Sequence, residues 1–234
     1  MVAFEWGPLS GLWEFLECSV PNILILFFDW GAFDSLTIMA GYLGLTELAT
    51  AALLMNFLCI GDVIVRGIWD SATANIGNML GEGRPRRAII FGKVSILLTV
   101  TLSACFVTVI YSLRTVVPQM YTLNPKIVHL TSLCMLPLLI LTAINNMINN
   151  LIAISRGMGR QGTVSIVNFV TMWLVGIPLA YILAFKMGHS LTGLYVGLSV
   201  GGALNVACMA ITVSLPDWDK LAEEIAEGLS MDAE

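Results

Sequence analysis

Six long runs of apolar residues determine what this chain of 234 residues can fold into. A helix needs about 20 mostly apolar residues to cross a hydrocarbon core about 30 Å thick. Runs of that kind occupy residues 12–38, 46–80, 89–111, 127–154, 162–185 and 191–213. Polar or turn-forming segments separate them. The pattern predicts an all-α integral membrane fold with six transmembrane helices.

The charge content supports a lipid environment for most of the surface. Only 12% of the residues are charged, whereas 57% are hydrophobic, and a soluble domain usually carries about 25% charged residues. The formal net charge is -5, and much of it comes from a short acidic segment after Leu215. We therefore expect a six-helix lobe over residues 1–213 and an acidic, amphipathic cytoplasmic tail over residues 214–234. No basic patch for nucleic acid is evident.

Lys and Arg residues are unequally distributed between the segments that join the runs. One side, which also holds both chain ends, has Arg84, Arg86, Arg87, Lys93, Arg156, Arg160 and Lys220. The opposite side has Arg114, Lys126 and Lys186. Because positive loops stay in the cytoplasm, this asymmetry predicts a multi-pass protein with both termini cytoplasmic. The plasma membrane and a vacuolar or other organelle membrane both remain possible locations.

No motif in the chain indicates an enzyme. There is no phosphate-binding loop for nucleotide hydrolysis, and no serine-hydrolase or zinc-protease motif. The five cysteines are scattered, no two form a Cys-x-x-Cys pair, and the two histidines lie far apart, so no metal site is predicted. We expect no cofactor other than a coupling ion, H⁺ or Na⁺.

Two acids occur in the first apolar run. A charge near the middle of a bilayer costs at least about 2.5–3.5 kcal/mol on insertion scales, so Asp29 and Asp34 both need a reason. Asp29 is predicted to be a cavity carboxylate that carries either a proton or a cation; the alternative is a helix-packing acid bonded to a neighbouring Ser, Thr or Trp. Asp34 lies roughly 140° further round the helix, so it need not face the same cavity, and it could be merely interfacial.

Three further charges share one stripe of the second run. Asp62, Arg66 and Asp70 are spaced four residues apart, which places them on one helix face. Arg66 could extend between the two acids as this long helix leaves the membrane. The alternative is an ion-pair gate that lines the cytoplasmic mouth of a cavity.

The fourth run contains a cluster of amides. Asn145, Asn146, Asn149 and Asn150 must find hydrogen-bond partners in hydrocarbon. They could link helices, or they could donate into a cavity, and the sequence leaves both alternatives open.

Several short motifs, in order along the chain, resemble the multidrug and toxic compound extrusion (MATE) transporters. They include Gly41-Tyr-Leu-Gly44, Gly77-Asn-Met-Leu-Gly81, Arg156-Gly-Met-Gly-Arg-Gln-Gly162, Val175-Gly-Ile-Pro178, Gly193-Leu-Tyr-Val-Gly197 and Asp217-Trp218. Trp13, Glu14-Phe-Leu-Glu-Cys18 and Asp29-Trp30 are similar to the eukaryotic members.

The resemblance implies the second half of a twelve-helix transporter, in which two six-helix lobes enclose the substrate cavity. Such transporters exchange organic cations or other toxic compounds for protons or sodium ions. Asp29 then matches the binding acid of the first helix of this lobe, and Asp34 matches a second acid of the eukaryotic members. Asn56 occupies the position of an acid, and Asn145 or Asn146 replaces another.

Three other positions depart from the family pattern that the resemblance suggests. Val65 and Arg66 stand where the family usually has proline and a small residue, and Asn75 replaces an arginine. These departures leave Asp29 as the principal acid of the lobe.

The sequence therefore predicts a lobe of a secondary active transporter that exports organic cations or xenobiotics by antiport. Two alternatives remain, a degenerate non-transporting scaffold or regulatory half and a flippase for a lipid-linked substrate from the same superfamily. The replacement of acids by asparagine favours the scaffold, whereas Asp29 and Asp34 favour transport. Expected partners are the organic cation, membrane lipid, and either an N-terminal lobe or a second copy of the chain.

Overall fold

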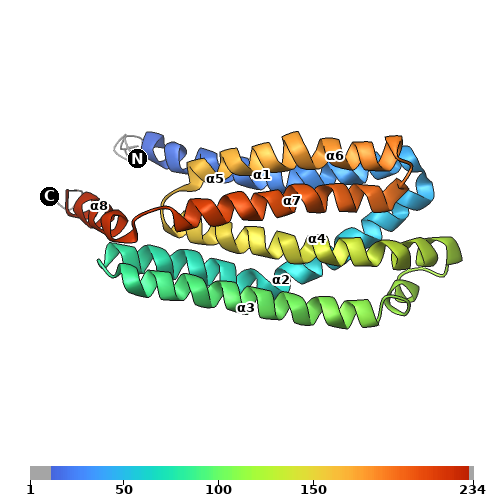
Figure 1. The fold of residues 1–234 in the computed structure, drawn as a ribbon, viewed down its shortest axis with the longest axis horizontal. Coiled ribbons are helices and arrows are strands. Elements are labelled where there is room, and N and C mark those ends of the chain that lie inside the picture. The colour runs from blue at the N-terminus through green and yellow to red at the C-terminus, as the bar shows by residue number, and fades with distance from the viewer. Residues whose placement is uncertain (1–11, 232–234) are drawn as a thin grey trace, which may run out of the picture.

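The computed structural model describes residues 12–231, and every regular element in that range is a helix (Figure 1). Six long helical segments form an elongated bundle. They are α1 (Leu12–Leu43), α2 (Leu45–Gly81), α3 (Pro85–Ser112), α4 (Pro125–Gly157), a segment over residues 161–186, and α7 (Ser190–Ser214). A short 3₁₀ helix, η2 (Val117–Met120), precedes α4, and α8 (Trp218–Met231) follows α7.

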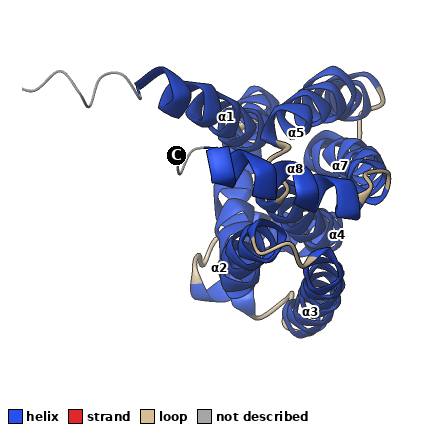
Figure 2. Cartoon of the chain, turned by 90° about the vertical axis from the view of Figure 1, so that its left-hand side faces the viewer, coloured by secondary structure: helices blue, strands red, loops and turns tan. Residues whose placement is uncertain are grey.

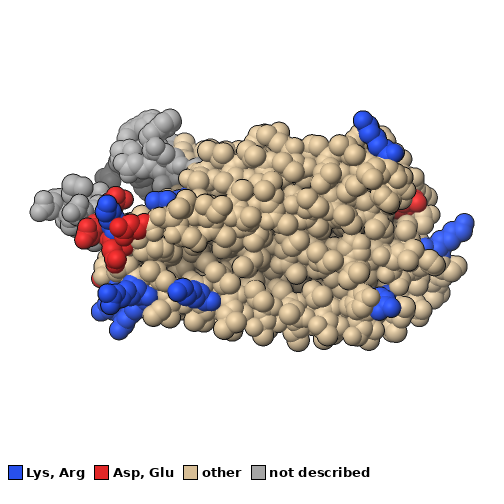
Figure 3. Space-filling model, in the orientation of Figure 1, with Lys and Arg blue, Asp and Glu red and all other residues tan. Residues whose placement is uncertain are grey.

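The six predicted spans are confirmed. Six helices in the described part of the chain are long and apolar enough to cross a membrane. Charged side chains gather at the two ends of the bundle, and the face between them is uncharged (Figure 3). The first span continues past the predicted end at residue 38, because the helix breaks only at Gly44, whose φ of 154° is accessible almost only to glycine.

The fifth span is a single helical segment that is partly wound as a π-helix. It consists of α5 (Gln161–Asn168), η3 (Phe169–Gly176), α6 (Ile177–Tyr181) and η4 (Ile182–Lys186), and both η3 and η4 are π-helical. Pro178 lies in the first turn of α6. Proline has no N–H and its ring clashes with the carbonyl of the preceding turn, so the wider π-helical turns before it accommodate the ring.

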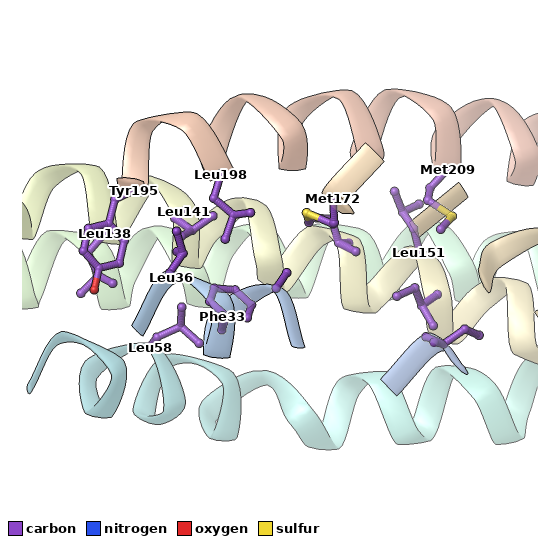
Figure 4. Close-up of a cluster of buried hydrophobic side chains, with 14 of the residues drawn as sticks. Phe33, Leu36, Leu58, Leu138, Leu141, Leu151, Met172, Tyr195, Leu198 and Met209 are labelled. Atoms are coloured by element: carbon purple, nitrogen blue, oxygen red, sulfur yellow. The ribbon is translucent and has the colours of Figure 1, made fainter. Parts of the chain in front are cut away.

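Helix α4 is the centre of the bundle. It packs against α2, α3, α5 and α7, and the view along the bundle shows these neighbours around it (Figure 2). Figure 4 shows Leu138, Leu141 and Leu151 of α4 within the apolar core, together with Phe33 of α1 and Leu198 of α7. The buried side chains of α4 thus join α2 and α3 to α5 and α7.

Small residues allow α7 to approach the fifth span closely. Gly193, Gly197 and Gly201 recur every four residues on the face toward that span, and an added Cβ at any of them would overlap its backbone. At Gly197 the obstacle is Ala180, and at Gly201 it is Gly176. Close contact through small residues at this spacing is typical of membrane helix pairs.

The amphipathic helix α8 caps the end of the bundle where α1 begins and α7 ends (Figure 1). It packs against α2 and α3; Leu221 and Ala222 are buried, whereas Asp219, Glu223 and Glu224 are exposed. The predicted tail, residues 214–234, therefore contains a packed helix from Trp218 to Met231, and residues 232–234 lie outside the described range.

Candidate functional site

A cavity of about 160 Å³ lies between α1, α2 and α4. Five charged side chains line it. They are Asp29 from α1, Asp62, Arg66 and Asp70 from α2, and Arg156 from α4. Three separate helices therefore bring charges into one cavity within a bundle that otherwise keeps charge at its ends.

Asp29 is the most deeply buried of these charges. Only 8% of its surface is exposed, and its Oδ1 atom is buried without a hydrogen-bond partner. Asp62 and Arg156 both interact with it electrostatically. Within the described residues no Ser, Thr or Trp donates to this carboxylate, as a helix-packing acid would require. A buried polar atom without a partner is uncommon in native proteins, which marks Asp29 as a candidate ligand-binding group.

Asp62 is half-buried and is held by an amide from the neighbouring helix. The Nδ2 atom of Asn145 donates to both carboxylate oxygens of Asp62, at 3.2 and 3.3 Å. The Oδ1 atom of Asn145 is itself buried without a partner. The amide of Asn145 therefore positions the carboxylate of Asp62, and its own oxygen remains free to accept a hydrogen bond.

Arg66 and Asp70 are exposed and line the cavity together with Asp62. The four-residue spacing left two alternatives for Arg66, a position between the two acids or an ion-pair gate. Across residues 12–231, however, the structure contains one ion pair within 4 Å, Arg84–Glu82 at 2.8 Å, so Arg66 does not contact either acid at that distance. All three residues of the stripe line the cavity, and their role as a gate stays a prediction.

Arg156 was assigned to the cytoplasmic side and was not recognised as a cavity residue. It lies in the last turn of α4, is half-buried, and has a buried Nε atom without a partner. Its guanidinium interacts electrostatically with Asp29 and Asp70. One signal could have found it: Asn145, Asn149 and Arg156 are spaced four and seven residues apart, which places them on one face of α4.

Four other predicted site residues do not line this cavity: Asp34, Asn56, Asn145 and Asn146. Asp34 is exposed and belongs to a shallow, largely apolar hollow along α1 that includes Trp30. Asn56 is exposed, and its side chain donates to the carbonyl of Ala52 in its own helix at 2.9 Å. Asn146 donates to Ser103 of α3 at 2.9 Å. Of the two alternatives for the replaced acid, Asn145 is the one that contacts a cavity residue, because it donates to Asp62.

The amide cluster of α4 divides between two faces. Asn146 and Asn150 face α3, where Asn150 donates to Thr99 at 2.9 Å and lies 3.3 Å from the Ser95 hydroxyl. Asn149 lines the charged cavity and donates to the carbonyl of Asn145. Asn145, Asn146 and Asn150 thus link helices, and donation from the cluster to a ligand in the cavity stays a prediction.

A second buried amide group went unnoticed in the sequence. Asn205 of α7 donates to Asn168 and to Thr171, both at 2.8 Å, and all three side chains are buried. It joins α7 to the fifth span at the start of the π-helical turns, which is a structural role. Over the described range no group of three or more His, Cys, Asp or Glu residues is arranged to hold a metal ion.

The fold and the cavity together define a class, the multi-pass α-helical membrane proteins that carry a charged cavity in a helix bundle. The MatE family model matches residues 21–182. The chain belongs to this family, the multidrug and toxic compound extrusion transporters, and the resemblance seen in the sequence is confirmed.

Two similar relatives and one similar solved structure are longer than this chain. It is 28% identical over 229 residues to Protein DETOXIFICATION 36 of Arabidopsis thaliana, covering 97% of this chain and 45% of the relative. It is 25% identical over 215 residues to multidrug and toxin extrusion protein 1 of Homo sapiens, covering 90% of this chain and 37% of that protein. The fold matches the crystal structure of the eukaryotic MATE transporter AtDTX14 with a TM-score of 0.89 at 22% identity, over 96% of this chain and 51% of that one. The chain thus spans less than half the length of these two relatives.

Proposed function

We propose that this chain forms one lobe of a secondary active transporter that exports organic cations in exchange for protons or sodium ions. The observation that carries the proposal is the buried, unpartnered carboxylate oxygen of Asp29 in a cavity that holds more acids than bases. A proton or Na⁺ and an organic cation can compete for one such carboxylate. That competition is sufficient to couple their movements in opposite directions.

The charged cavity favours a transporting lobe over a degenerate scaffold. Asparagine replaces the acid at position 145, but its amide holds the carboxylate of Asp62. Asp62 and Asp70 therefore supply acids near Asp29. A lobe that had lost its function would have no reason to retain three acids between membrane helices, since each is costly there.

A partner should cover the open side of the cavity. Leu26, Trp30 and Val63 line the cavity and are 55%, 41% and 66% exposed, and Arg66 and Asp70 are exposed beside them. Lipid against this surface would leave charges in hydrocarbon. An N-terminal lobe, or a second copy of this chain about a twofold axis, would cover it and complete the cavity.

The orientation in the membrane follows from the loop charges. We place both termini, α8 and the α2–α3 hairpin in the cytoplasm, because seven Lys and Arg residues in or beside the connecting segments lie at that end. Single cysteines introduced at Arg86 and Glu224 should react with an impermeant reagent from the cytoplasmic side, and one at Lys126 from the other side. Labelling of positions 86 and 126 from the same side would contradict this topology.

Transport itself can be tested in proteoliposomes that contain the chain alone or together with an N-terminal six-helix lobe. An imposed pH or Na⁺ gradient should drive movement of the methylphenylpyridinium cation with a partner lobe present or when the chain is a dimer. A monomer of this chain that transports the cation would refute the half-transporter proposal. Absence of gradient-driven transport in both arrangements would refute the antiporter proposal.

A further inference from the structure

The charges around the cavity do not cancel. Asp29, Asp62 and Asp70 contribute three negative charges when ionised, and Arg66 and Arg156 contribute two positive charges. No other ionisable Asp, Glu, Lys, Arg or His among the described residues lines the cavity. The fully ionised cavity is therefore short of one positive charge.

Arg156 is the base that approaches the buried acid. Its guanidinium comes from α4, interacts electrostatically with Asp29 of α1 and Asp70 of α2, and has a buried Nε atom without a hydrogen-bond partner. Arg156 forms no ion pair within 4 Å with either acid. Between residues 12 and 231 the only ion pair at that distance is Arg84–Glu82. Arg156 thus offsets negative charge in the cavity without forming an ion pair with the carboxylate of Asp29.

We infer that Arg156 is a specificity-determining residue that limits the cavity to a monovalent cation. The inference rests on the proposed function and adds the valence of the ligand. One proton, one Na⁺ or one singly charged organic cation neutralises the cavity, and each can replace another without leaving a charge buried. A dication would leave an excess positive charge beside Arg156, which is costly where the effective dielectric constant is low.

The structural alternative is that Arg156 only stabilises the end of α4. A basic residue in the last turn of a helix interacts favourably with the helix dipole, and this would explain its position. The two roles differ in one measurable respect. A dipole contact changes stability only, whereas a charge in the cavity changes the relative affinities for monovalent and divalent ligands.

The test compares two probes with the same two-ring skeleton, the methylphenylpyridinium monocation and the methyl viologen dication. Their Kd values are measured by equilibrium binding to the full chain in lipid nanodiscs. Arg156→Gln removes one positive charge, and a dication gains twice as much from this as a monocation. We expect the ratio of Kd for the dication to Kd for the monocation to fall at least tenfold, whereas Arg156→Lys should keep the wild-type ratio.

The expected change is physically reasonable. A tenfold change in the ratio corresponds to about 1.4 kcal/mol, which two unit charges about 12 Å apart provide at an effective dielectric constant of about 20. Two exposed residues supply further variants if Arg156→Gln fails to fold. Arg66→Gln should shift the ratio in the same direction by a smaller factor, and Asp70→Asn should shift it in the opposite direction.

The outcomes separate this inference from the proposed function. An unchanged ratio in folded Arg156→Gln, or in both Arg66→Gln and Asp70→Asn where Arg156→Gln does not fold, overturns the valence role and leaves cation binding standing. A wild-type chain that binds neither probe, alone or with an N-terminal lobe, overturns both.

Discussion

The two faces of α4 carry nearly the same side chains and make opposite use of them. Toward α3, the Nδ2 atoms of Asn146 and Asn150 donate to Ser103 and Thr99, although Oδ1 of Asn146 is buried there without a partner. Toward α1 and α2, Asn145 and Asn149 stand beside carboxylates and guanidinium groups, and several polar atoms there have no partner. We call the first face the amide contact. The second face borders the charged cavity between α1, α2 and α4.

The difference shows how to separate structural polarity from a ligand site in a membrane protein. A polar group in hydrocarbon must be bonded, and a bonded group between two helices links them. A polar group that stays unbonded beside a cavity carries a cost that a ligand can relieve. Residue type alone does not distinguish the two cases, because asparagine appears in both.

The largest effect is expected at Asp29. Asp29→Asn keeps the size of the side chain and removes its charge, so coupled cation transport by the complete two-lobe protein should fall to background in proteoliposomes, with expression little changed. Asp34→Asn is the matched control, because Asp34 lies on the same helix outside the cavity; its transport rate should stay within about twofold of wild type, the scale of an ordinary exposed substitution. Wild-type transport by Asp29→Asn would show that this acid is structural. The two faces of α4 would then not differ in function.

The amide contact should lose stability and keep function. Asn150→Leu removes the bonds to Thr99 and Ser95, and interhelical hydrogen bonds in membranes are worth about 0.6 kcal/mol on average and at most about 1.7. We expect a loss of about 1–2 kcal/mol in the free energy of unfolding, measured in mixed micelles, with cation affinity unchanged. Asn149→Leu, one residue along, should leave stability nearly unaltered since Asn149 bonds its own helix. Equal losses in the two variants would show that the faces do not differ in this way.

The hydrogen bond between Asn145 and Asp62 joins α4 to a residue of the charged cavity. Its contribution to the free energy of unfolding should be smaller than that of the Asn150 bonds. A double-mutant cycle with Asn145→Leu and Asp62→Leu isolates the pair, because each substitution alone removes the bond. We expect a coupling free energy of about 1 kcal/mol in unfolding experiments, because a charged acceptor strengthens the bond. Zero coupling would mean that the amide does not position Asp62.

The smallest effect is expected at Ser95. Its hydroxyl lies 2.8 Å from the carbonyl oxygen of Gly92 and 3.3 Å from Oδ1 of Asn150, so the contact to Asn150 is the weaker of two. Ser95→Ala should lower the free energy of unfolding by less than about 0.5 kcal/mol. A loss as large as that of Asn150→Leu would place Ser95 at the centre of the amide contact and require the bond to Gly92 to be secondary.

Much of the fold could be predicted from the sequence because lipid imposes a simple requirement. Each spanning segment needs about 20 apolar residues in one helix, so the six spans were found with errors of a few residues. The largest difference was at the end of the first span, where the motif Gly41-Tyr-Leu-Gly44 suggested a longer break. The helix continues to Leu43 because a single glycine suffices to turn the chain.

The site was only partly predictable. Asp29, Asp62, Arg66 and Asp70 were found because charges are rare in apolar runs. Arg156 was missed because it occurs at the edge of a span, where a basic residue is expected in any case. The π-helical turns of the fifth span and the buried pair of Asn168 and Asn205 gave no periodic signal, since both depend on contacts between segments.

The number of membrane helices, the family and the acid in the first span could be read from the residues, because hydrophobic length, short motifs and intramembrane charges are local properties. Helix packing was needed to show which of these charges share a cavity and which asparagines link helices. Neighbouring residues on a helix point about 100° apart, so Asn149 and Asn150 face different neighbours. Only the packing of α3 on one side of α4, and of α2 on another, assigns Asn145, Asn146 and Asn150 their partners.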